Sequence, residues 1–530
     1  MKTVTKIALI ALLWLTVINS GSLGSLDTDL RLQMANAWWT GTEEVRIPPG
    51  YKLKVRGDIV AGVVGVDGKR YIAYEQGQSV LMLPGDWLGS QLHRWFPAIP
   101  EKDMRDLVVN FLIFIPLNVA AVVACFWLLT LFNFSERVAG LTSILFLLGT
   151  TFLHYAQVHQ HNNQVLLFVT IGYAAALACA LRGNQPMAAI SGLALGGTVL
   201  LRITSMIHAF TILLFFVGCM GYKTRDKDKT IKAAGLWIAG FIPFALVGRI
   251  FDFIRYGSFF ATGKSVEKQQ LATDPMWTGL PDLPANYPLV NEPHVGILGP
   301  LITPAKSIFI YDPLLIPCII LGIIFWKRLS PYIQWYLITG VFNLGLHLAA
   351  YSRFFFWHGD SAWGARYQVT SVQMILIPLL GLFVHQLLSE RGLRAWLMRG
   401  IVTIAIMVQI ASVTMPMNLE IFQTQVGMPG SRLDFRLAQR LTNMVCLVNS
   451  SFSRGCVERN PDKKRYVKEW NHIYFLPFNF SQKAAENPNL VKFTRILYGF
   501  WGLVLVGAIA STLWFVFWSS GQSPELMKLS

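Results

Sequence analysis

The stretch SLDTDLRLQMANAWWTG, Ser25–Gly41, follows the first apolar segment and opens a long region that lacks the character of a membrane span. If this region faces away from the cytoplasm, Asp27 and Asp29 lie at the mouth of a helix bundle. An ionised carboxylate beside the membrane can accept a proton while lipid keeps water away, so either acid is a candidate general base. Alternatively, Asp27 or Thr28 caps the helix predicted over Leu30–Trp39. The two roles are compatible.

The composition is that of an all-α polytopic membrane protein. Of 530 residues, 53% are hydrophobic, 35 are Phe and 17 are Trp, and the mean hydropathy is +0.46, which is typical of a chain that spans the bilayer many times. The net charge is +16. Most basic residues fall in short loops between apolar runs, where they set orientation, so nucleic acid is not an expected partner.

Apolar windows long enough to cross the hydrocarbon core predict about twelve spans. After the first helix they cover 107–132, 138–155, 164–181, 186–202, 205–221, 233–254, 308–326, 332–351, 367–388, 400–416 and 493–518. Basic loops such as Lys223–Lys232 then place both termini in the cytoplasm by the positive-inside rule. Residues 1–20 also fit a secretory signal peptide, but we favour a retained first helix because so many spans follow.

The long loops are expected together on the opposite, periplasmic side of a bacterial inner membrane. They cover 22–104, 255–305, 352–366 and 417–492. Within the first, Gln78–Leu92 is moderately apolar but is interrupted by Pro84, which is typical of an interfacial helix rather than a span. No clear internal repeat is present, which argues against a transporter built on inverted repeats.

The six cysteines divide into two groups. Four lie inside apolar segments, where cysteine usually acts as a small hydrophobe. Cys446 and Cys456 share the polar loop 417–492. If that loop is outside the cytoplasm, their spacing suits a local disulfide.

Three cations are expected near the outer ends of spans. Arg366 adjoins aromatic residues, and its guanidinium either binds a phosphate or snorkels to lipid head groups. Arg202 falls between two apolar segments, where a charge needs a partner or water. Lys306 is predicted at the same level.

Two further patterns suggest sites that their spacing does not support. His154, His159 and His161 invite a metal, but they do not share one helical face and no acid lies among them. Hydrogen bonding to sugar or phosphate, or capping, is the alternative. GSFFATGKS, Gly257–Ser265, has one residue too many between its glycines for a phosphate loop.

Five stretches in order carry a family resemblance. They are Ser25–Gly41, Asp67–Ser79, Arg255–Gly263, Thr303–Pro313 and Trp363–Tyr367. Together they resemble the GT-C superfamily of lipid-linked-sugar glycosyltransferases, in particular bacterial relatives of the dolichyl-phosphate-mannose protein mannosyltransferases and the lipid A aminoarabinose transferases. The resemblance implies a GT-C-like transmembrane catalytic module over 1–390. The region 391–530, with its loop 417–492, then forms a possible acceptor-side region.

The resemblance also bears on single positions. Asp27 matches the family's catalytic acid better than Asp29. Glu75 stands where a small residue is more usual, and Ala365 where proline is common. Many relatives have an acid in the second outward loop, but His159–Asn163 has none, which leaves a second acid, or a metal held by it, without support.

The implied function is an inverting glycosyltransferase that moves a sugar from a polyprenyl-monophosphate carrier to an acceptor hydroxyl on the outer side of the membrane. Asp27 would accept the proton, while Arg366, with Arg202 or Lys306, would stabilise the charge on the departing phosphate. No cofactor is required, with a divalent metal as the alternative. Contacts to the sugar or acceptor are expected from Tyr71, Gln78, Tyr155, His159, Trp363 and Tyr367.

Two other functions compete with this interpretation. A lipid-linked oligosaccharide flippase or exporter would line its pathway with the same cations, but its expected signature is charge at mid-span depth in several helices, and most spans here have none. The second alternative, intermediate between a glycosyltransferase and a flippase, is a polymerase or ligase for lipid-linked glycans. The acceptor itself, whether glycan, lipid or protein, is not specified by the sequence.

Overall fold

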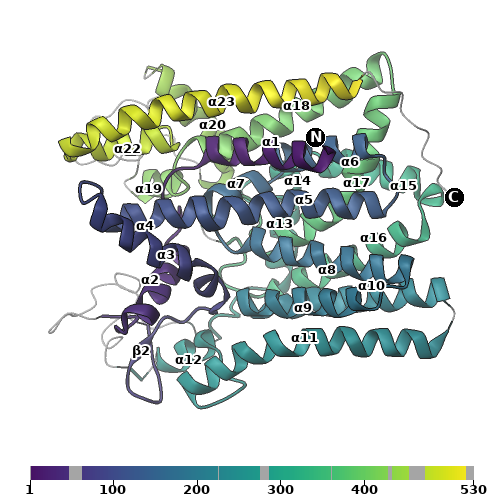
Figure 1. The fold of residues 1–530 in the computed structure, drawn as a ribbon, viewed down its shortest axis with the longest axis horizontal. Coiled ribbons are helices and arrows are strands. Elements are labelled where there is room, and N and C mark those ends of the chain that lie inside the picture. The colour runs from purple at the N-terminus through teal and green to yellow at the C-terminus, as the bar shows by residue number, and fades with distance from the viewer. Residues whose placement is uncertain are drawn as a thin grey trace.

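The computed structural model describes residues 2–46, 62–224, 226–271, 273–274, 284, 286–359, 361–425, 427, 433–449, 451–452 and 472–520. The long helices lie side by side along one direction and form a single bundle (Figure 1). Over these residues the structure is all-α apart from one short hairpin, in which β1 (Val63–Val64) pairs antiparallel with β2 (Arg70–Tyr71).

The helices follow one another in this order: α1 (Thr3–Ile18), α2 (Leu26–Thr40), α3 (Gly77–Trp95), α4 (Glu101–Val109), α5 (Ile115–Leu131), α6 (Glu136–Gly149), α7 (Phe152–Val158), α8 (Asn162–Arg182), α9 (Pro186–Leu201), α10 (Met206–Thr224), α11 (Lys227–Tyr256), α12 (Gly263–Gln270), α13 (Pro293–Ile302), α14 (Ile308–Tyr311), α15 (Leu315–Ile324), α16 (Pro331–Tyr351), α17 (Val369–Ser389), α18 (Leu393–Thr414), α19 (Leu419–Gln425), α20 (Arg436–Val448), α22 (Leu476–Glu486) and α23 (Val491–Ser520). A π-helical turn, Asn110–Phe114, joins α4 to α5.

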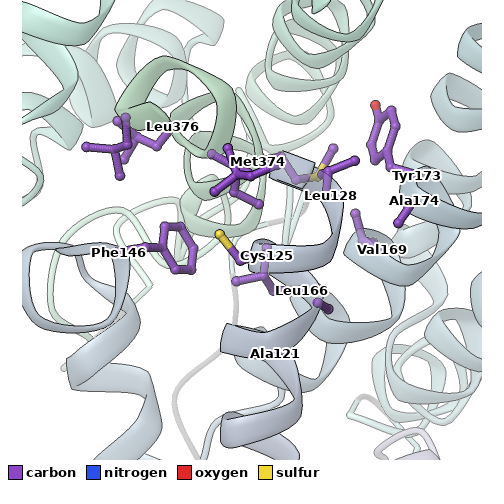
Figure 2. Packing of buried hydrophobic residues seen from close by; sticks show 14 of the residues in the cluster. Ala121, Cys125, Leu128, Phe146, Leu166, Val169, Tyr173, Ala174, Met374 and Leu376 are labelled. Carbon is purple, nitrogen blue, oxygen red and sulfur yellow. The ribbon is translucent and has the colours of Figure 1, made fainter. Parts of the chain in front are cut away.

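The core lies where α5, α6, α8 and α17 meet (Figure 2). Cys125, Phe146, Leu166 and Met374, one from each of these helices, are exposed by 1% or less. Helices from both predicted regions contribute to this cluster, because Val413 of α18 belongs to it. The functional division at residue 390 therefore stays a prediction, and the C-terminal helices pack on the same core.

Small residues let two of the helices approach closely. A Cβ atom on Gly192 of α9 would lie 1.9 Å from the carbonyl oxygen of Trp237 in α11, and one on Gly240 would lie 2.1 Å from the carbonyl oxygen of Ala189. Close backbone packing at glycine is the usual way in which membrane helices associate without a strong hydrophobic drive.

The chain has the helices of a multi-pass membrane protein. Seven helical segments of the described residues are long and apolar enough to cross a bilayer, and α6 with α7 form an eighth that is bent by 59°. The four remaining predicted windows coincide with α1, α9, α15 and α16, which are shorter or less apolar. The count of about twelve spans thus stays a prediction, because length and composition support seven or eight.

The helices of the predicted outward loops gather at one end of the bundle. Figure 1 shows α2, α3, α12, α19 and α22 together at its left, away from the cytoplasmic ends predicted for the spans. The expected interfacial helix is present as α3, which begins one residue before Gln78, contains Pro84 and is not among the apolar spans.

The start of α2 corrects one expectation. The helix begins at Leu26, with Ser25 at the N-cap position, so Asp27 and Asp29 lie inside the first turn and neither acid caps the helix. Thr28 is likewise inside it. A negative charge in a first turn still interacts favourably with the helix dipole. The carboxylate of Asp27 is left to make tertiary contacts.

Candidate functional site

Asp27 forms an ion pair with Arg366, which lies 339 residues further along the chain. The Nη2 atom of Arg366 donates to Oδ2 of Asp27 at 2.6 Å, and the hydroxyl of Tyr74 donates to Oδ1 at 2.9 Å. The two charged side chains are 23% and 13% exposed. The first outward loop and the loop before α17 therefore meet at one carboxylate.

Electrostatics keep Asp27 ionised. Burial would raise its pKa, but the guanidiniums of Arg366 and Arg31 and the hydrogen bonds from Arg366 and Tyr74 outweigh burial and hold the pKa well below the usual value. Burial and the neighbouring Asp27 in turn raise the pKa of Tyr74 to about 12. Asp27 is thus an anion whose proton affinity depends on what its cationic partners bind.

Further cations surround this pair. The guanidinium of Arg31, one turn after Asp27, lies 4.4 Å from the ring centroid of Tyr74 and donates to the backbone oxygen of Asp27 at 3.2 Å. Lys264 of α12 lies 4.6 Å from the same ring and is paired with Glu267 at 2.7 Å.

Arg202, directly after α9, contacts two tyrosine rings. Its Nη2 donates to the hydroxyl of Tyr351 at 2.5 Å, and its guanidinium lies 5.0 Å from the ring centroid of Tyr367, the neighbour of Arg366. The rings of Tyr351 and Tyr367 are stacked at 4.3 Å. The structure thus places Arg202 beside Tyr367, while the binding roles expected of these residues stay predictions.

A cavity of about 270 Å³ opens beside the ion pair. It is lined by Asp27 and Arg366 with Ser25, Leu26, Gln160 and Ser361, and by α19 and the residues before it through Met417, Asn418, Ile421, Phe422 and Gln425. Of the described residues in this lining, only Asp27 and Arg366 carry charge. Residues of the predicted acceptor-side region 391–530, here called the α19 wall, therefore contribute part of the lining.

The polar segment between α7 and α8 lies against this centre. His159 ends α7 with a left-handed backbone, φ 53°, and its carbonyl oxygen accepts hydrogen bonds from Thr28 and Gln78. The amide of Asn162 donates to the backbone oxygen of Arg366 at 2.9 Å. His159 itself stacks on Phe114, with ring centroids 4.4 Å apart.

Several buried polar atoms of this segment lack a hydrogen-bond partner among the described residues. They are Oε1 of Gln160, both ring nitrogens of His159 and of His161, and Oδ1 of Asn162 and of Asn163. Leaving a buried polar atom unpaired costs about 1–3 kcal/mol, so a cluster of such atoms beside a cavity is suited to a polar ligand.

Other predicted residues form hydrogen bonds to the backbone of the loop that carries Trp363 and Arg366, here called the Trp363 loop. The hydroxyl of Tyr155 donates to the backbone oxygen of Trp363 at 3.0 Å, and the ammonium of Lys306 donates to that of Ala362 at 2.7 Å. Trp363 is fully buried, and the guanidiniums of Arg436 and Arg440 each lie 5.6 Å from its ring centroid. These contacts hold the loop that carries Arg366. They differ from the substrate contacts predicted for Tyr155, Trp363 and Lys306.

The remaining predicted residues have partners of their own. Asp29 pairs with Lys102 at 3.0 Å, and the hydroxyl of Tyr71 donates to Asp67 at 2.7 Å. Both contacts are exposed to solvent. Gln78 donates to the carbonyl oxygen of His159 at 2.7 Å. Asp27 is therefore the better candidate base of the two acids.

The structure bears on the predicted metal and disulfide sites in different ways. Among the described residues, no group of three or more His, Cys, Asp or Glu side chains is arranged to hold a metal ion. Cys446 lies on α20, is buried and is disulfide-bonded, whereas Cys456 is outside the described residues. The pairing of Cys446 with Cys456, like the expected independence from metal, stays a prediction.

Sequence reasoning did not identify Tyr74, Arg31 or the α19 wall. Tyr74 lies within the resembling stretch Asp67–Ser79, and Arg31 lies one helical turn after Asp27, so the helical repeat itself could have indicated Arg31. The α19 wall had no comparable signal, because it is brought to the site only by tertiary packing.

Comparison with known proteins adds no family assignment. No protein-family model matches the chain, and no curated protein gives a significant match.

Proposed function

We propose that this chain is an inverting glycosyltransferase of the GT-C type, which moves a sugar from a polyprenyl phosphate to an acceptor hydroxyl on the outer face of a bacterial inner membrane. In this proposal about twelve spans place both termini in the cytoplasm. The observation that carries it is the Asp27–Arg366 pair in the wall of a cavity, at the end of the bundle where the predicted outward loops gather.

Asp27 supplies the base. The acceptor oxygen attacks the anomeric carbon, its proton passes to the Asp27 carboxylate, and the bond between the anomeric carbon and the phosphate oxygen breaks with its electron pair remaining on the phosphate. Attack from the face opposite the phosphate inverts the anomeric centre. The proton then leaves Asp27 for solvent.

Arg366 acts on the leaving group. Its forked guanidinium has several donors and pairs with Asp27 through one of them, while its Nε is buried and without a partner among the described residues. A departing phosphate gains negative charge, which fixed guanidinium donors stabilise more strongly than they stabilise the ground state. As Arg366 turns toward the phosphate, its ion pair with Asp27 weakens. The carboxylate of Asp27 therefore becomes a stronger base.

The α19 wall suits the acceptor. It lines the same cavity as Asp27, and its described lining residues are apolar or carry amides, namely Met417, Asn418, Ile421, Phe422 and Gln425. An acceptor that enters from this side presents a neutral hydroxyl to the base. This assignment agrees with the acceptor-side role predicted for 391–530.

The experiment is an analysis of envelope glycans in the source organism. A strain that lacks the gene should lose one sugar substituent from its glycans, lipids or glycoproteins, and mass spectrometry would identify both the sugar and the acceptor. The wild-type gene should restore it and the Asp27→Asn gene should not, at equal protein levels. Restoration by the Asp27→Asn gene would remove the proposed base, and an unchanged envelope in the deletion strain would argue against the function.

A further inference from the structure

We propose that His161 is a phosphate-binding residue, which completes an anion site formed with Arg31, Arg202 and Arg366. The inference rests on the proposed function and names the group that the site holds, namely the phosphate of the lipid carrier. Among the alternatives that the sequence left open for His161, it selects phosphate binding, and it adds Arg31 to the site.

His161 is buried without a partner. Its side chain is 5% exposed, and neither ring nitrogen has a hydrogen-bond partner among the described residues. An imidazole always carries at least one N–H, and burying it unpaired is costly. Since the two nitrogens point to opposite sides of the ring, at least one is free to donate to a ligand.

The surroundings of His161 are cationic. The charged groups that act most strongly on its ring are Arg31, Arg202 and Arg366, opposed by the carboxylate of Asp27. The guanidiniums outnumber the carboxylate among these groups, which favours an anionic ligand such as a phosphate. Arg31 and Arg366 also each have a buried Nε that lacks a partner among the described residues, so donors as well as charge remain available.

Backbone geometry favours an anion in the same place. His161 occupies the N-cap position of α8, a helix of 21 residues, whose first N–H groups and dipole present positive potential at this end. The segment is fixed relative to Arg366, since Asn162 donates to the backbone oxygen of that residue at 2.9 Å. The unpaired imidazole and the helix terminus therefore lie next to the residue that pairs with Asp27.

A phosphate fits this set better than a sugar. Sugar hydroxyls need acceptors as well as donors, whereas guanidiniums and an imidazole N–H supply donors only. In the proposed reaction the donor is a phosphodiester with one negative charge and the product is a phosphate monoester with two. A cationic site would thus stabilise the product side, and the transition state leading to it, more than the bound donor.

The test uses three probes with the full chain in detergent. Farnesyl phosphate carries a short isoprenoid and the phosphate, farnesol lacks the phosphate, and inorganic phosphate lacks the lipid. Isothermal titration should show that wild-type protein binds farnesyl phosphate more tightly than either. Equal binding of inorganic phosphate would identify a site for the free ion and overturn the lipid assignment.

His161→Phe keeps a ring and removes both nitrogens. Its affinity for farnesyl phosphate should fall about 10–100-fold, as for a lost hydrogen bond to a charged group, while its affinity for farnesol stays at the wild-type value. His161→Gln retains an N–H donor and should recover part of the affinity. If His161→Phe does not fold, the glutamine variant and an Arg31→Gln variant, with an expected loss of similar size, still decide the question.

His93→Phe is the control. His93 lies in the last turn of α3, and its Nδ1 forms a hydrogen bond with the backbone oxygen of Ile99 at 2.8 Å. The variant should bind farnesyl phosphate as the wild type does. An equal loss in both histidine variants, or none in His161→Phe, would overturn the role of His161 and leave the proposed function standing. A wild-type protein that does not distinguish farnesyl phosphate from farnesol would instead overturn the donor class.

Discussion

Two of the arginine–carboxylate centres contact the loop that carries Trp363, and they differ in how fully the hydrogen-bond donors of their arginines are used. In one, Glu420 is fully buried and accepts hydrogen bonds from Arg436 at 3.1 Å and from Arg440 at 2.8 Å. In the other, Asp27 is 23% exposed and borders a cavity, and its partner Arg366 keeps an unpaired Nε.

The remaining donors make the contrast clearer. Arg440 also donates to the backbone oxygens of Met415 and Pro416, both at 2.9 Å, and Arg436 donates to that of Ala362 at 2.9 Å. None of the side-chain nitrogens of these two arginines is among the buried atoms without a partner. The Glu420 centre is saturated and joins α19 and α20 to the Trp363 loop. The Asp27 centre retains capacity for a ligand.

The comparison predicts the largest loss of stability at Glu420. Glu420→Gln leaves two buried guanidiniums without their carboxylate, so the free energy of unfolding should fall by about 3–5 kcal/mol. Thermal unfolding in detergent would measure it. Glu390→Gln, which removes an exposed i,i+4 pair with Arg394, should cost about 0.3–0.5 kcal/mol. Equal losses in the two variants would show that the buried centre does not support the fold.

At the Asp27 centre the expected loss is in turnover. Arg366→Lys keeps the charge but has no fork with which to serve both Asp27 and a phosphate, so kcat should drop about 10²-fold with little change in stability. Arg353→Lys, in the same loop and exposed, is the matched control and should retain wild-type turnover. Wild-type kinetics in Arg366→Lys would leave only the alternative in which Arg366 extends to the lipid head groups.

A smaller effect is expected at Tyr74. Burial raises the pKa of Asp27, while Arg366, Arg31 and the Tyr74 hydroxyl lower it, so Tyr74→Phe should raise that pKa. Because the base works when ionised, the acid limb of the kcat/KM profile should move to higher pH, by less than in Arg366→Ala. Tyr222→Phe, at the far end of α10, should not move it. If the acid limb shifts to lower pH, or stays unchanged in both Tyr74→Phe and Arg366→Ala, then the acid limb does not reflect the ionisation of Asp27.

The sequence predicted the parts of this site that local pattern can reveal. Asp27 and Arg366 stand out because each is a charge next to an apolar segment, and the helix of 77–95 was expected within two or three residues. The Glu420 centre could not be anticipated. Its members come from α19 and α20, where isolated charges in a polar loop are typical of a solvated face, and only packing shows that they are buried.

One expectation failed for an identifiable reason. Asp27 was weighed as a helix cap, but the helix begins at Leu26, because helix boundaries inferred from pattern are uncertain by a few residues. The phosphate contact expected of Lys306 stays a prediction. In the structure its ammonium donates to the backbone oxygen of Ala362, a contact that sequence position could not indicate because it depends on the direction of the side chain.

The decisive measurement is the transfer of radiolabelled sugar from polyprenyl phosphate by purified protein in nanodiscs, with Asp27→Asn beside Asp29→Asn. Asparagine keeps the size of aspartate, but its amide is too weakly basic to accept the acceptor's proton, so Asp27→Asn should lower transfer by about 10²–10⁴-fold while folding normally. Asp29, paired with exposed Lys102, should tolerate the same change with transfer near the wild-type rate. Near-normal transfer by Asp27→Asn, or a dead Asp29→Asn variant beside an active Asp27→Asn variant, would contradict the assignment of Asp27 as the base.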